Sequence, residues 1–123
     1  MNLEIEAKEF LRKKNMSNIT ATEYQRKAKE TAIFPADKAL EYLSLGLVGE
    51  AGEVANKVKK LIRDKKVLLD TTLISSEIGD VLWYCAMLAD YLDVNLGKIM
   101  DDNLDKLKSR KQRGTLGGTG DNR

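Results

Sequence analysis

Histidine is absent from this chain, and cysteine and proline each occur once. Without histidine the chain cannot form a Ser–His or Cys–His nucleophilic pair, a His-bearing zinc site, or the Glu-x-x-His motif of di-iron helix bundles. Any catalysis must therefore use carboxylates, lysines, arginines, hydroxyl groups or a bound metal. The single cysteine, Cys85, excludes a disulfide within the chain and suits a reducing cytosol, so we expect a cytoplasmic protein.

Long apolar runs are also lacking. The chain has no apolar stretch of the roughly 18 residues that a transmembrane helix needs, and its acidic N-terminus lacks a signal-peptide pattern. Its 123 residues fit one domain, and 33% charged with 42% hydrophobic residues are typical of a soluble helical protein. A net charge of +2 provides no strong general attraction to membranes or nucleic acid.

One proline and few alternating β-branched runs favour an all-α fold. Apolar residues recur at spacings of three and four, which predicts helices. We expect them over residues 2–14, 21–32, 38–64, 71–92 and 94–110. The predicted organisation is an N-terminal helical extension (1–16), a helical domain (17–113) and a Gly-rich tail (114–123), whose composition favours disorder.

Specific residues predict where some of these helices begin and end. Thr20-x-x-Glu23 is a capping box, so a helix is expected to start at Ala21. Phe34-Pro35 should end that helix, because the residue before proline disfavours the α region. Asp93 is the expected cap of the last helix.

Two short acidic clusters carry the strongest chemical signal. Glu50 and Glu53 are three residues apart in one predicted helix, and Glu77 and Asp80 are three apart in the next. Residues at this spacing share a helix face, so two facing helices would bring four carboxylates together. Such a group repels itself and favours protonation unless a cation is bound. The pattern therefore predicts an oxygen-ligand metal site between two helices.

The positions within each cluster differ. Glu50 and Glu77 fall on or beside the core-facing stripes, where a lone carboxylate needs a partner or an ion. Glu53 and Asp80 are more lateral, and Glu53 has an alternative interpretation as the i+4 partner of Lys57. Three glycines inside the predicted helices flank the acids: Gly49, Gly52 and Gly79. Each costs about 1 kcal/mol of helix stability relative to alanine. They indicate either the close approach of another helix or a ligand, or relaxed packing.

Other polar and aromatic residues have two interpretations each. Asn103 lies on an apolar stripe, with Lys106 and Arg110 continuing at spacings of three and four. These residues form either a solvated basic face or a set of phosphate contacts. Trp83 and Tyr84 follow Asp80 closely and are either core aromatics or a stacking surface for a base.

Three segments together resemble the MazG-like, all-α nucleoside triphosphate pyrophosphohydrolases. They are Leu47-Val-Gly-Glu-Ala-Gly-Glu-Val54, Glu77-Ile-Gly-Asp-Val-Leu-Trp-Tyr84 and Asn103-Leu-Asp-Lys-Leu-Lys-Ser-Arg110. The ending over 117–123 is also similar to tails of small phage and bacterial members, and the resemblance covers roughly residues 20–123. It implies a helical bundle completed by homo-oligomerisation, as a homodimer or homotetramer. It also implies hydrolysis of nucleoside or deoxynucleoside triphosphates to the monophosphate and pyrophosphate with Mg²⁺ or Mn²⁺.

The resemblance also implies roles for individual residues. The metal ligands and catalytic groups would be Glu50, Glu53, Glu77 and Asp80. The candidate contacts to phosphate or sugar would be Lys57, Lys60, Asn103, Lys106 and Arg110, and the base would meet Trp83 and Tyr84. Many members carry a further glutamate where this chain has Gly49, which leaves open the number of metals and which carboxylate is the base.

Other functions compete with this one. A sister activity on phosphoribosyl-ATP or ppGpp would use the same fold, and a substrate panel would separate these. A non-catalytic helical interaction module is the rival from another class, although the chain has all four acids. The basic run over 106–113 would suit a nucleic-acid binder, but its shortness and the net charge of +2 argue against that.

Overall fold

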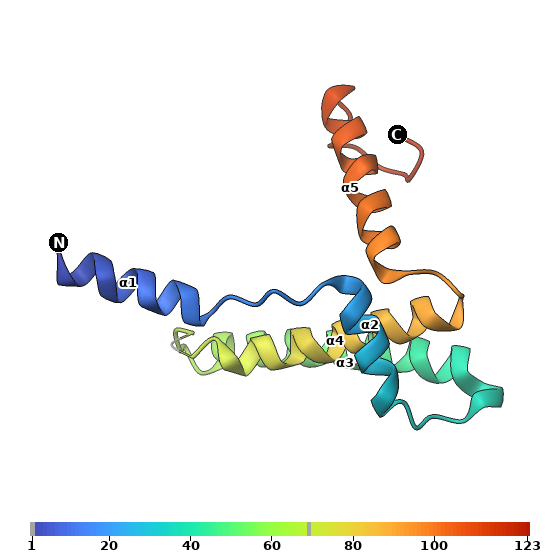
Figure 1. Cartoon of the computed structure of the whole chain (residues 1–123), viewed down its shortest axis with the longest axis horizontal. Helices are drawn as coiled ribbons and strands as arrows, with labels where there is room; N and C mark the ends of the chain where they lie inside the picture. Colours follow the sequence, from blue (N-terminus) through green and yellow to red (C-terminus); the bar gives the residue numbers. More distant parts are fainter. Residues whose placement is uncertain (1, 69) are drawn as a thin grey trace.

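The computed structural model describes residues 2–68 and 70–123, which form helices joined by turns and contain no strand (Figure 1). The expected all-α class is confirmed. The elements are α1 (Leu3–Lys14), α2 (Ala21–Ala28), η1 (Lys29–Thr31), η2 (Ala36–Lys38), α3 (Ala39–Arg63), α4 (Thr72–Tyr91) and α5 (Leu96–Gln112), where η denotes a 3₁₀ turn.

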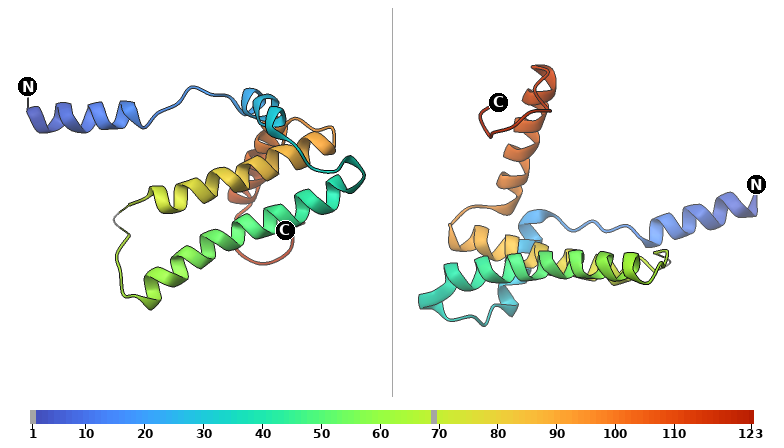
Figure 2. Two further views of the ribbon diagram at one scale, coloured as in Figure 1. Left: turned by 90° about the horizontal axis from the view of Figure 1, so that it is seen from below. Right: turned by 180° about the vertical axis from the view of Figure 1, so that it is seen from behind.

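An antiparallel hairpin of α3 and α4 forms the centre of the fold, and α2 packs across α4 (Figure 2). The first part of α5 packs against α2 and α4, and the rest of this helix then leaves the hairpin (Figure 1). Helix α1 stands apart at the end of an extended segment over residues 15–20. Among the described helices, none combines the length and apolar character that crossing a membrane requires.

The predicted capping box is confirmed at the start of α2. The Thr20 side chain accepts a hydrogen bond from the Glu23 backbone N–H at 3.1 Å, and Glu23 accepts one from the Thr20 N–H at 3.2 Å. The expected cap of α5 was wrong, because Asn95 and not Asp93 fills that position. Asp93 has a φ of 57° and turns the chain between the helices, whereas the extended Asn95 presents its side chain to Lys98 N at 3.2 Å.

The core is small and lies where α2, α3, α4 and the start of α5 meet. Its buried cluster comprises Ala28, Leu43, Ala86, Met87 and Leu96. The buried residues of α4 are Ala86, Met87 and Ala89. None of them belongs to the apolar stripe that spacing predicts for this helix, which comprises Ile74, Ile78, Val81, Cys85, Leu88 and Leu92, so the predicted buried face was wrong. Ile78 and Leu92 from that stripe are 50% and 60% exposed, because α2 packs on the alanine side of α4.

One buried polar side chain, Gln25, connects α2 to the link between α4 and α5. Its amide nitrogen donates to the carbonyl oxygens of Val94 at 2.9 Å and Ala86 at 3.4 Å. Its amide oxygen accepts from the Leu96 N–H at 2.8 Å. The Val94 carbonyl precedes α5 and the Leu96 N–H belongs to its first turn, where intrahelical partners are lacking, so Gln25 fixes where α5 begins. No local pattern in the sequence predicts this role for Gln25.

The Gly-rich tail folds back on α5, so the expectation of disorder was wrong. Arg110 is 5% exposed and donates through Nη2 to the Asp121 carbonyl at 2.7 Å. Arg113 donates to the carbonyl oxygen of Arg123 at 3.0 Å. The guanidinium groups of these two arginines thus donate hydrogen bonds to carbonyl oxygens of the tail. Turns at Gly114 and Gly118, both with positive φ, bring those carbonyl oxygens within reach of the arginines.

Candidate metal centre

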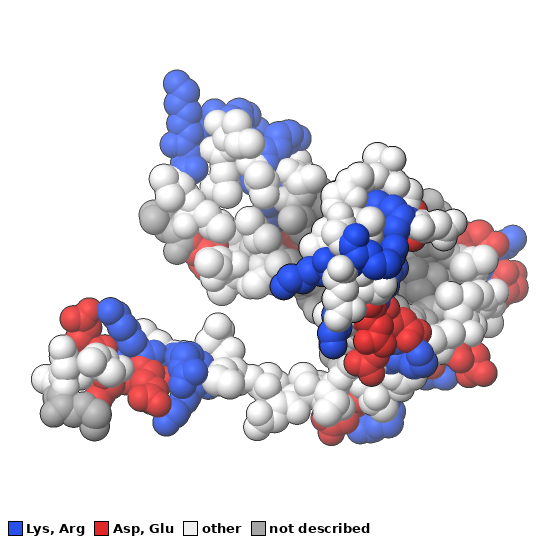
Figure 3. Space-filling model, turned by 90° about the horizontal axis from the view of Figure 1, so that it is seen from above, with Lys and Arg blue, Asp and Glu red and all other residues white. Residues whose placement is uncertain are grey.

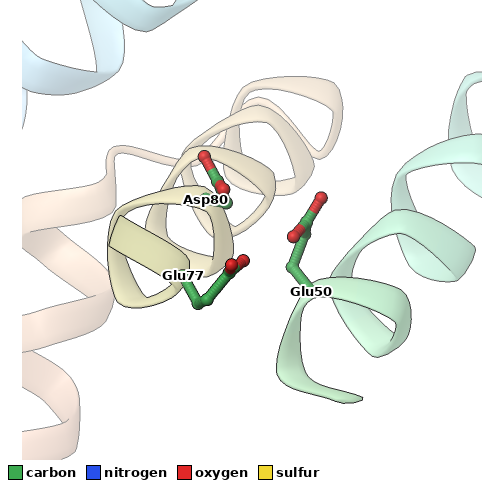
Figure 4. A group of neighbouring side chains, drawn as sticks. All are labelled: Glu50, Glu77 and Asp80. Carbon is green, nitrogen blue, oxygen red and sulfur yellow. The ribbon is translucent and has the colours of Figure 1, made fainter. Parts of the chain in front are cut away.

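Three of the four predicted carboxylates come together between α3 and α4. Glu50 projects from α3 toward Glu77 and Asp80 on α4 (Figure 4). One carboxylate oxygen from each of the three lies within 4.8 Å of the others. Glu50 and Glu77 are half-buried and Asp80 is exposed, in agreement with their positions on and beside the core-facing stripes.

The electrostatic conflict expected from this grouping is present. Partial burial raises the pKa of the Glu50 carboxyl, and the negative charges of Asp80 and Glu77 raise it further. Lys57 neutralises part of this negative charge. Its Nζ lies 2.9 Å from a Glu77 carboxylate oxygen, and this hydrogen bond raises the pKa of Lys57. Within the described ranges this is the one salt bridge to the group, so three carboxylates share one lysine.

Glu53 lies outside the group, on the exposed side of α3. Its charge contributes the smallest of the effects that raise the pKa of Glu50, so Glu53 flanks the centre without joining it. The alternative pairing of Glu53 with Lys57 was wrong. Lys57 turns across the hairpin to Glu77 instead, where the other carboxylates strengthen its attraction.

A cavity of about 310 Å³ opens beside the carboxylates and is lined by Thr31, Glu50, Asp80, Trp83 and Tyr84. The Trp83 indole nitrogen donates to the Thr31 hydroxyl at 2.8 Å, which fixes the ring. The ring of Trp83 meets that of Tyr84 edge-on, with centroids 5.0 Å apart. Both rings also pack against the core cluster, which confirms the interpretation as core aromatics, and the stacking surface for a base stays a prediction.

The three glycines flanking the acids are not needed for packing within the chain. A Cβ atom added at Gly49, Gly52 or Gly79 would meet nothing within 4 Å, so the expected approach of another helix was wrong for the described chain. The glycine that packing does require is Gly46, where an added Cβ would lie 2.1 Å from the Tyr84 ring. Its position three residues after Leu43, on the core-facing side of α3, was the signal that could have identified it.

The predicted basic residues divide into two sets. Lys57 and Lys60 lie on α3, and both line a second cavity at the end of the hairpin. Asn103 and Lys106 lie on the part of α5 that leaves the hairpin, and both are exposed (Figure 1). Asn103 is exposed although it lies on an apolar stripe, because nothing in the described part of the chain covers that face of α5. Arg110, in contrast, is buried beneath the tail.

Residues 38–115 match the MazG nucleotide pyrophosphohydrolase domain, and this span includes α3, α4, α5 and every predicted carboxylate. The chain belongs to the MazG nucleotide pyrophosphohydrolase family. It is also 49% identical over 109 residues to the Gene 37 protein of Mycobacterium phage L5, a match that covers 81% of this chain and 96% of that protein. No solved structure shows a significant match to the chain.

The donor set of this MazG domain fits a divalent cation. Mg²⁺ prefers oxygen ligands at about 2.1 Å, so two ligands of one ion lie about 3–4 Å apart. Carboxylate oxygens that already lie within 4.8 Å of one another need only small side-chain rotations to reach that spacing. A bound cation would also relieve the repulsion that raises the pKa of Glu50.

Proposed function

We propose that this MazG domain hydrolyses nucleoside or deoxynucleoside triphosphates to the monophosphate and pyrophosphate, with Mg²⁺ as cofactor and Mn²⁺ as a possible replacement. The observation that carries the proposal is the group of Glu50, Glu77 and Asp80 within a domain of this family. A cavity with two aromatic rings adjoins the group and offers a surface for a base.

Each residue then has a distinct task. Glu50, Glu77 and Asp80 hold the cation, and Glu53, which lies outside this group, adds negative charge beside it. The bound cation would supply positive charge to the phosphates and lower the pKa of a water molecule. Lys57 orients Glu77 through their salt bridge. Lys57 and Lys60 together neutralise the outer phosphates of the substrate. Trp83 and Tyr84 form the wall against which the base lies.

We also propose that the chain acts as a homodimer or homotetramer. Large apolar side chains are exposed on helices near the site: Val48 is 71% exposed on α3, Leu82 is 48% exposed on α4 and Leu104 is 64% exposed on α5. Apolar surface spread over three helices in this way is typical of a subunit interface. Assembly is also the arrangement in which Asn103 and Lys106, which stand away from the hairpin, can meet a nucleotide.

Pyrophosphate release, measured across canonical and modified triphosphates, phosphoribosyl-ATP and ppGpp with and without Mg²⁺, tests the activity. We expect release from at least one nucleoside or deoxynucleoside triphosphate only when the cation is present. Asp80→Asn should lower that rate by more than about 100-fold while the helical circular dichroism is unchanged, because it weakens cation binding.

A matched control is Glu41→Gln, which neutralises an exposed acid in the first turn of the same α3 helix that carries Glu50. This variant should hydrolyse the substrate at the wild-type rate. If Asp80→Asn also retained the wild-type rate with Mg²⁺, the proposed site would be wrong. If no compound in the panel released pyrophosphate, a non-catalytic interaction module would be the better account.

A further inference from the structure

Helix α1 exposes an apolar face that nothing in the described chain covers. None of its residues is buried, and Leu3, Phe10 and Leu11 are 80%, 65% and 62% exposed. At 3.6 residues per turn these three side chains lie on one side of the helix together with Ala7. The extended segment over 15–20 holds this face away from the rest of the molecule (Figure 1).

A helix of this length is marginal in water on its own. Its internal support consists of the Asn2 cap, which accepts from Glu4 N at 2.9 Å, and exposed ion pairs such as Lys8–Glu4 at 2.8 Å. Exposed pairs of this kind contribute only a few tenths of a kcal/mol. Packing of the apolar face on another surface is therefore what would make α1 a stable helix.

The end of the α3–α4 hairpin offers such a surface. A cavity of about 310 Å³ opens there, with an apolar floor formed by Leu61, Leu68, Leu73 and Ile74. Its rim is basic, with Lys57, Lys60 and Lys66. The one acid on the rim, Asp64, is already paired with Arg63 at 2.7 Å. We refer to this cavity, with its floor and rim, as the hairpin-end pocket.

Charge links the helix to the pocket. The first turn of α1 carries Glu4 and Glu6 at the edges of its apolar face, and its last turn carries Arg12, Lys13 and Lys14. Lys66 on the pocket rim forms no salt bridge within the described residues. Figure 3 shows acidic and basic side chains next to one another on the separate arm that α1 forms, so only its first turn is purely acidic. A surface with an apolar floor and a basic rim fits a helix with an apolar face and an acidic first turn.

We propose that α1 of one chain packs its Leu3, Phe10 and Leu11 face into the hairpin-end pocket of a second copy. The arm and the pocket lie at the same end of the molecule (Figure 2), so two copies related by a two-fold axis exchange arms reciprocally. A second copy is favoured over the chain's own pocket because the capping box at Thr20 fixes the start of α2, from which the extended segment carries α1 away from its own hairpin.

Disulfide trapping between separately purified proteins tests this arrangement. Phe10→Cys and Leu73→Cys, each also carrying Cys85→Ser, are mixed at micromolar concentration and oxidised. We expect a dimer in which mass spectrometry finds positions 10 and 73 linked, which can form only between two chains. Arg12→Cys, on the opposite face of α1, is the matched control and should give at least about five-fold less product.

The charge argument has its own test. Lys66→Glu in the pocket-bearing partner should lower the linked product at least about five-fold, and added salt should lower it as well. Equal yields from Phe10→Cys and Arg12→Cys would overturn the proposal, as would a linkage found only within single chains carrying both cysteines. No step of the assay involves nucleotide or Mg²⁺, so its outcome is independent of the proposed hydrolysis.

Discussion

Replacement of Gly46 by alanine tests how closely α3 and α4 pack. The added Cβ would lie 2.1 Å, 2.4 Å and 2.7 Å from three atoms of the Tyr84 ring, where carbon atoms normally stay about 3.5–4.0 Å apart. The ring therefore has to move by more than about 1 Å. It cannot do so freely, because Trp83 lies against one side of it and Tyr42 is 6.4 Å away between centroids.

The expected magnitude follows from two opposing effects. Overpacking of this kind typically costs about 1–3 kcal/mol, and the severity of the clash places Gly46→Ala at the upper end. Alanine in place of glycine within a helix returns about 1 kcal/mol. We therefore expect a net loss of about 1–2 kcal/mol in the free energy of unfolding.

Urea unfolding followed by circular dichroism at a fixed protein concentration measures this loss. The matched control is Gly49→Ala, one turn along the same helix, where an added Cβ meets nothing within 4 Å. That variant should be stabilised by about 0.5–1 kcal/mol through helix propensity alone. Equal stability of Gly46→Ala and the wild type would refute the close contact, and destabilisation by Gly49→Ala would show that another molecule packs there.

Two further predictions concern the core and the assembly. Gln25→Leu should lower the free energy of unfolding by about 2–4 kcal/mol, because it leaves the buried Leu96 N–H and the partly buried Val94 carbonyl without partners. Gln112→Leu, at an exposed position in the last turn of α5, should change it by less than about 0.5 kcal/mol in the same urea titration. Light scattering coupled to size exclusion should give the mass of a dimer or tetramer, and a stable monomer at micromolar concentration would contradict the proposed assembly.

Local signals in the sequence were enough to predict the helices. The capping box at Thr20 acts within a few residues, so no knowledge of the fold was needed to interpret it. The end of the same helix was less predictable, because the α-helix stops at Ala28 and continues as a 3₁₀ turn to Thr31, before Phe34-Pro35 is reached. The prediction that Asp93 caps α5 was wrong because Asp and Asn both favour caps and turns. The path of the chain between α4 and α5 decides that Asp93 forms the turn and Asn95 the cap. Gln25 was missed because its three hydrogen bonds reach residues more than sixty positions away.

The carboxylates were predictable for a different reason. Glu50 and Glu77 sit on core-facing stripes, and an acid in such a position conflicts with the pattern around it. Spacing alone could not separate Glu53 from the other three, since that depends on how α3 is rotated against α4. The tail was misjudged because its order comes from arginine hydrogen bonds to its own carbonyls, which leave no hydrophobic pattern.

The carboxylates lie between α3 and α4, the same two helices that hold the fold together. This placement sets the stability of the hairpin against the capacity of the site to bind a cation. The negative charges of Glu50 and Asp80 repel each other across α3 and α4, so a substitution that neutralised either one would strengthen the hairpin and weaken cation binding. Selection for activity would then keep the chain below the stability that its packing could reach. Such a chain has little reserve for further destabilising mutations, and its tolerance to change should depend on the supply of cations around it.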